Sequence, residues 1–168
     1  MMGITVLHWH ANSLNGHAAE LKNYIKNSKT VQTLFVYKKR FLNLILISRL
    51  QGTLQKIKCR KNGKGGVATF IRDGIEYSSQ AVSGITEAVE ITITANNQKI
   101  EIHNIYISPN CETDIDYLAK TFEKTSAIIC GDLNAKNTLW GSPENDERGK
   151  LIGDLIEENN VTVLNTTI

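Results

Sequence analysis

Residues 128–142 read IICGDLNAKNTLWGS, an apolar run that leads directly into Asp132 and Asn134. The apolar residues from Ala127 to Cys130 are typical of a strand buried in a sheet. The Gly-Asp-Leu-Asn that follows has two interpretations. It forms an Asp/Asn turn, or it presents a carboxylate and a carboxamide at a strand end, where α/β sheets place their ligands.

Length and composition predict one domain with an ordinary core, since the chain has 168 residues of which 41% are hydrophobic. No run of about 18 apolar residues occurs, so no membrane helix is expected. The first ten residues do not resemble a signal peptide. The three cysteines are odd in number and widely spaced. They fit neither a zinc pattern nor a disulfide framework and favour an intracellular, reducing setting.

Charge is distributed unevenly along the chain, although the formal net charge is only +2. Residues 21–72 hold 13 Lys and Arg and no Asp or Glu. This basic segment has two interpretations: a surface for nucleic acid, or a stretch whose composition was never selected. Charge alone leaves both open.

Apolar periodicity predicts a mixed sheet with interleaved helices, which is an α/β layered domain. Residues 30–62 contain apolar runs but no clean period, and no element is assigned to them. The expected helices are 13–27, 114–126 and 149–160, and the expected strands are 4–9, 67–71, 89–94, 100–107, 127–131 and 161–165.

Three expected strand ends carry side chains suited to phosphate chemistry. His10 follows the first strand, Tyr106 ends the strand before Ser108, and Asp132 and Asn134 follow another. A carboxylate suits Mg²⁺, a carboxamide can donate to a phosphate oxygen, and a tyrosine hydroxyl can bond a phosphate or the attacking group. Singly, each residue is more common in turns or cores. Together they are parts of a metal-assisted phosphodiester hydrolysis site.

The surrounding segments resemble the endonuclease domain of non-LTR (LINE-like) retrotransposons, in the exonuclease–endonuclease–phosphatase superfamily. The resemblance spans residues 3–28 and 62–167. It is carried by ITVLHWHANSL (4–14), GKGGVATFIRDGI (63–75), IHNIYISPN (102–110), GDLNAKNTLWGS (131–142) and RGKLIGDLIEENNVTVLNT (148–166).

The resemblance implies a four-layer α/β sandwich that nicks target DNA in the nucleus with Mg²⁺, usually ahead of a reverse transcriptase on the same polyprotein. It matches Asp132, Asn134 and Tyr106 with the family's catalytic Asp, Asn and Tyr. The metal positions that remain in this chain are Asp132 and His10. A superfamily member acting on abasic sites or phosphoinositides is disfavoured by the loop around Trp140.

Three departures from the family predict that catalysis is lost. His10 stands where the family has an Asn that supports the metal site. The metal-binding Glu of a Gln-Glu-Thr segment has no counterpart, because residues 21–72 contain no Glu. The family's Ser-Asp-His segment would follow Ile168, so the sandwich is expected to be incomplete at its C-terminus. The first interpretation is a Mg²⁺-dependent DNA endonuclease by ancestry, expected to be inactive in this chain. The alternative is a non-enzymatic, decayed fragment that at most binds nucleic acid weakly.

Residues 30–60 are predicted to be a frameshifted stretch within one partial domain, residues 1–168. Codons that encode Val36 to Phe41, when read from the third base of each, allow Leu-Gln-Glu-Thr-Phe, which is the missing segment. A shift near Thr30 and a return near Lys61 would explain the absence of acids. On this hypothesis the basic segment is no evolved DNA-binding surface and should pack poorly.

Overall fold

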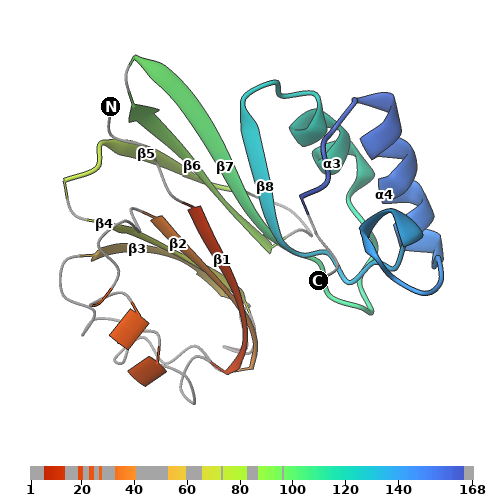
Figure 1. Cartoon of the computed structure of the whole chain (residues 1–168), viewed down its shortest axis with the longest axis horizontal. Coiled ribbons are helices and arrows are strands. Elements are labelled where there is room, and N and C mark those ends of the chain that lie inside the picture. The colour runs from red at the N-terminus through yellow and green to blue at the C-terminus, as the bar shows by residue number, and fades with distance from the viewer. Residues whose placement is uncertain are drawn as a thin grey trace.

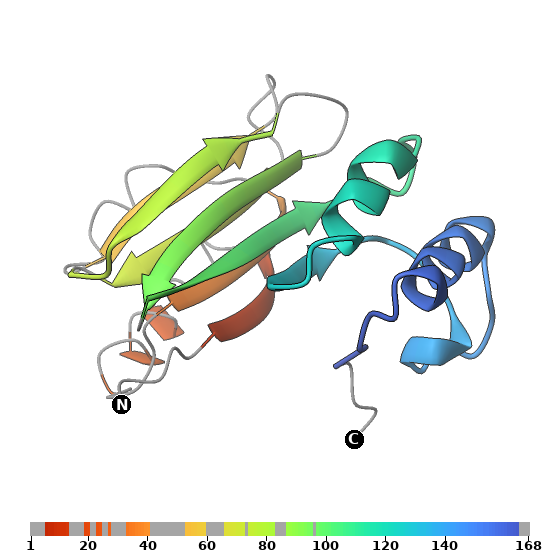
Figure 2. The same ribbon diagram turned by 90° about the horizontal axis from the view of Figure 1, so that it is seen from above.

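The computed structural model shows two four-stranded sheets packed face to face, with helices covering the outer face of the second sheet (Figure 1, Figure 2). It describes residues 6–13, 19–20, 23–24, 27, 33–40, 53–59, 66–72, 74–82, 87–95 and 97–164. The described helical residues between 19 and 27 lie on the outer side of the first sheet (Figure 1). The expected α/β layering is therefore confirmed.

The first sheet has the strand order β1-β2-β4-β3. β1 and β2 are parallel, and β4 pairs antiparallel with both β2 and β3. The strands are β1 (Val6–Ser13), β2 (Thr33–Arg40), β3 (Thr53–Cys59) and β4 (Gly66–Arg72). β2 and β3 fall in the stretch to which the sequence assigned no element.

The second sheet has the order β5-β6-β7-β8 and is antiparallel except for the pair β7–β8. Its strands are β5 (Tyr77–Ala81), β6 (Glu87–Ala95), β7 (Gln98–Tyr106) and β8 (Ala127–Asp132). The remaining elements are α3 (Ile115–Phe122), the 3₁₀ turn η1 (Thr138–Trp140) and α4 (Glu147–Glu158).

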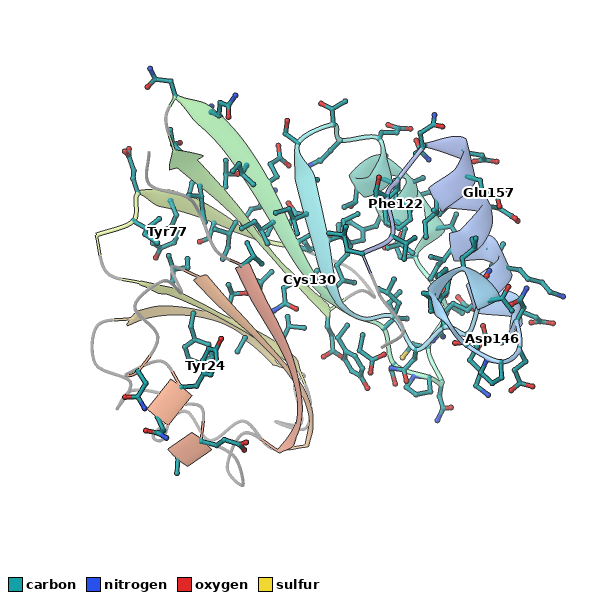
Figure 3. All side chains as sticks on the ribbon, viewed as in Figure 1. Tyr24, Tyr77, Phe122, Cys130, Asp146 and Glu157 are labelled. Carbon is teal, nitrogen blue, oxygen red and sulfur yellow. The ribbon has the colours of Figure 1, made fainter. Side chains whose placement is uncertain are left out.

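Alternation along β7 divides the interior into two cores. Ile102 and Tyr106 face the first sheet and belong to the core between the sheets. Ile105 belongs to the core beneath the helices, where Phe122 of α3 also lies (Figure 3). The end of β7 is therefore held from both sides.

The strand expected over 161–165 is wrong for residues 161–164, which join neither sheet; residue 165 lies outside the described part. The Val161 amide donates to the carbonyl of Ile156, and Val161 packs in the core beneath the helices. The apolar side chain of Val161, which sequence periodicity assigned to a sheet strand, thus packs in the core beneath the helices just after the end of α4. Within the described residues, no helix is long and apolar enough to cross a membrane.

Candidate active site

Tyr106 and Asp132 end the adjacent parallel strands β7 and β8, where they are direct register partners. Neighbouring strands lie about 4.8 Å apart, and paired residues point to the same face. That face is turned toward the first sheet, because Tyr106 is in the core between the sheets with only 5% of its surface exposed. The structure therefore brings these two predicted site residues together at one edge.

Gly131 makes this close pairing possible. Its φ is +130°, in the region that favours glycine, and a Cβ at this position would overlap the carbonyl oxygen of Ile105. Beyond it, the amide of Ile107 donates to the carbonyl of Asp132 at 3.0 Å. β8 thus remains bound to β7 up to the residue that carries the carboxylate.

Asn134 is fixed between the two strand ends. Its backbone amide donates to Asp132 Oδ1 at 2.9 Å, and its side-chain Nδ2 donates to the carbonyl of Ile107 at 2.9 Å. Its φ is +45°, a left-handed conformation that Asn tolerates better than most residues. The Asp/Asn turn and the converging side chains are one arrangement, so the two interpretations of Gly-Asp-Leu-Asn do not exclude each other.

Glu87 is a neighbour of this pair that the sequence reasoning missed. It is the register partner of Tyr106 on β6, two residues before Val89 of the core between the sheets, and therefore lies on the same face. Glu87, Tyr106 and Asp132 form a row across three strands. Counting back from the tight turn between Ala95 and Gln98 would have given this register, because a hairpin turn fixes every pair behind it.

His10 lies on β1, paired through the backbone with Tyr37 of β2. Both strands approach β8 across the space between the sheets, and β1 and β8 run in the same direction (Figure 1). Their carboxyl ends therefore lie toward the same side of the sandwich. The side chain of His10 is outside the described part, and its approach to Asp132 stays a prediction.

Comparison with known proteins agrees with this geometry. Residues 100–167, which include Tyr106, Asp132 and Asn134, match the family model described as endonuclease-reverse transcriptase. The solved endonuclease domain of TRAS1, a telomere-specific non-LTR retrotransposon, is 20% identical and superposes with a TM-score of 0.75 over 96% of this chain and 75% of that one. Residues 100–167 therefore resemble the endonuclease-reverse transcriptase family, and the chain has the fold of the TRAS1 endonuclease domain.

The chain is also similar to two further proteins. A probable RNA-directed DNA polymerase from transposon BS of Drosophila melanogaster is 22% identical over 99% of this chain. The chain spans only 19% of that relative's length. TDP2 of D. rerio, solved with a single-strand DNA product, is 12% identical, with a TM-score of 0.54 over 89% of this chain and 64% of that chain.

The family that residues 100–167 resemble implies a divalent metal, and this domain offers a poor ligand set for one. Mg²⁺ is held by oxygen ligands, chiefly carboxylates. β1, β2, β3 and β4 contain no Asp or Glu, so the entire first sheet opposite Asp132 lacks a carboxylate. Glu87 is two strands from Asp132, about 10 Å between backbones, with Tyr106 between them.

Other metal-binding side chains do not complete the set. Nowhere among the described residues do three or more His, Cys, Asp or Glu side chains gather so that they could share an ion. Cys130, on the same strand as Asp132 (Figure 3), is half-buried, and desolvation of its thiol raises the pKa to about 12. The thiol therefore stays protonated and is no ligand. The residues described do not fit a catalytic Mg²⁺ ion.

Proposed function

We propose that this domain binds DNA and descends from a Mg²⁺-dependent endonuclease that nicks target DNA, but does not itself hydrolyse phosphodiester bonds. One observation carries this proposal: the first sheet, which faces Asp132, contains no carboxylate. One carboxylate binds a hard divalent ion weakly, because such sites normally combine several oxygen ligands. Without the ion, the developing charge on a phosphate lacks its main stabilisation.

What remains at the site is suited to holding a phosphate. Tyr106 carries a hydroxyl at the edge that Asp132 shares, and the Asn134 amide gives one N–H to the carbonyl of Ile107 and has a second. The fold neighbour TDP2 was solved with a single-strand DNA product, which supports DNA as the ligand class. The curated relative is by name an RNA-directed DNA polymerase, which supports a reverse transcriptase on the same polyprotein.

The alternative is an active Mg²⁺-dependent endonuclease, and the retained Tyr106–Asp132–Asn134 arrangement favours it. The purified chain should be incubated with supercoiled plasmid in Mg²⁺ or in EDTA, beside the Asp132→Ala variant. We expect no nicking above the Asp132→Ala level in either condition. Nicking that requires Mg²⁺ and disappears in Asp132→Ala would establish the alternative.

DNA binding is measured separately by fluorescence anisotropy of a labelled duplex in EDTA. We expect binding that weakens steeply as salt rises, since contacts to phosphates release counterions. Failure of the domain to bind single-stranded or duplex DNA at low salt would refute the binding half of the proposal.

A further inference from the structure

Arg148, in the first turn of α4, donates hydrogen bonds to two loops at once. Nη1 reaches the carbonyls of Leu133 (3.2 Å) and Asn134 (3.0 Å), in the loop that follows Asp132. The other guanidinium nitrogens reach the loop that follows Tyr106: Nε donates to Thr113 Oγ1 (2.9 Å), and Nη2 to the carbonyls of Ser108 (3.2 Å), Pro109 (3.4 Å) and Cys111 (2.6 Å).

The start of α4 is built so that this side chain reaches both loops. Asp146 caps the helix (Figure 3), and its Oδ1 accepts from the amides of Gly149 (2.6 Å) and Lys136 (3.1 Å). A Cβ on Gly149 would overlap the carbonyl oxygen of Lys136, so only glycine allows the helix to lie this close. Gly149 therefore lets the start of α4 lie against the backbone of Lys136, and from this position the Arg148 side chain reaches both loops.

The guanidinium has no spare hydrogen-bonding capacity for DNA. It carries five N–H groups in a fixed plane, and six protein oxygens already receive them. Bonds from a charged donor are about twice as strong as neutral ones. A lysine in its place would offer three donors at one point and would not span both loops.

We propose that Arg148 is the positioning residue of the site: it sets the loop of Asp132 and Asn134 against the loop that follows Tyr106. Asn134 Nδ2 joins the same two loops through Ile107, so Arg148 and Asn134 close one small network around both strand ends. Any consequence for DNA affinity rests on the proposed function above. The positioning of the loops does not.

Hydrogen exchange measured by NMR separates positioning from general stability. The reporter is the amide of Asn134, bonded to Asp132 Oδ1, and the internal reference is the amide of Glu101, bonded to the carbonyl of Ser126 at the other end of the β7–β8 pair. In Arg148→Lys we expect Asn134 exchange to rise about tenfold, the factor carried by one lost hydrogen bond to a charged group, with Glu101 unchanged. The matched control is Lys150→Gln, an exposed change on the same helix, and should move neither amide.

Chemical rescue tests the same inference in Arg148→Ala. Guanidinium ion at a low, non-denaturing concentration should restore slow exchange at Asn134, whereas the same concentration of urea, which is uncharged, should not. Equal acceleration at Asn134 and Glu101 in Arg148→Lys, or no rescue in Arg148→Ala, would show that Arg148 is structural only. DNA affinity should fall in Arg148→Lys. If the wild-type domain binds no DNA, the proposed function is wrong, but the exchange experiment still tests the role of Arg148.

Discussion

Asn104 on β7 crosses from the second sheet to the first, where its Nδ2 donates to the carbonyl of Ala68 on β4 at 3.1 Å. The same nitrogen donates to Thr69 Oγ1 at 3.2 Å. Asn104 and Thr69 are completely buried. Because Asn104 lies two residues before Tyr106 on the same face, this bridge holds the two sheets together directly behind the site.

Replacing Asn104 with Ala should destabilise the domain by about 2–3 kcal/mol, because two buried hydrogen bonds are lost and a cavity remains. Urea unfolding followed by circular dichroism measures the change. The control is Gln98→Ala at the exposed start of β7, where we expect less than about 0.5 kcal/mol. A loss in Asn104→Ala no larger than in the control would mean that the bridge contributes nothing.

Gly131 and Gly74 form a matched pair for testing the tight approach of β8 to β7. Both have positive φ, +130° and +87°, but a Cβ overlaps Ile105 only at Gly131 and meets nothing within 4 Å at Gly74. Gly74→Ala should therefore cost only the backbone strain, about 1–2 kcal/mol. Gly131→Ala should cost more than about 4 kcal/mol or abolish folding, as read from thermal melts. Similar melting temperatures for the two variants would contradict the proximity of the strand ends.

Local patterns predicted β6, β7 and β8 of the second sheet and β1 and β4 of the first, but missed β2, β3 and β5. Alternating apolar residues mark β6, in which Val89, Ile91 and Ile93 are buried, and a continuous apolar run marks β8, whose residues are all partly buried. β2 ends in the basic run Lys38-Lys39-Arg40, which hides any alternation, and β3 is a short strand with few apolar residues. Their pairing with β4 is long-range and leaves no local sign.

The predicted site was partly visible from the sequence for the same reason. Tyr106, Asp132 and Asn134 follow recognisable strands, so their position at strand ends could be anticipated. Arg148 could only be assigned to the start of a helix, because five of its six partners are carbonyls of loops 14 to 40 residues away. Backbone acceptors have no residue type, and sequence patterns do not reveal them.

His103 provides a pH-dependent test of the face opposite the site. It is 1% exposed, with Nδ1 3.4 Å from Glu90 and Nε2 3.5 Å from Glu101, and Lys124 is paired with Glu101 at 2.6 Å. Burial lowers the pKa of His103, although Glu90 opposes the shift. Tyr117 of α3 also faces this cluster, and burial raises its pKa.

A lowered pKa means that the folded domain prefers neutral His103, whereas the unfolded chain takes up a proton near its ordinary pKa of about 6.5. Stability should therefore be full above about pH 7 and fall as the pH drops below the ordinary pKa of about 6.5. Urea unfolding at a series of pH values measures this slope, and His103→Gln should flatten it. If stability instead rises as the pH falls, and this rise is absent in His103→Gln, then the two carboxylates and not burial determine the pKa of His103.

The carboxyl end of β2 is where the frameshift hypothesis can be tested most sharply. Lys38 pairs with Ala11 on β1, one step beyond the pair of His10 with Tyr37. In the shifted frame, the restored Glu codon would combine the last base of codon 38 with the first two bases of codon 39. A carboxylate would then return to the parallel pair of strands that approaches β8, in the sheet that now has none.

This hypothesis dictates particular codons, and sequencing the gene decides it. Gln, Glu and Thr appear in the shifted frame only if Tyr37 is TAC, Lys38 is AAG, Lys39 is AAA and Arg40 is of the CGN class; Val36 must end in C or T to give Leu. Each is one choice among synonymous codons that are neutral for the protein as translated, so their joint occurrence is not required by any property of β2. Finding TAT at codon 37, AAA at codon 38, AAG at codon 39 or an AGR codon at 40 would remove the Gln-Glu-Thr segment. β2 would then be an original part of this domain, and Lys38 and Lys39 would again be candidate DNA contacts.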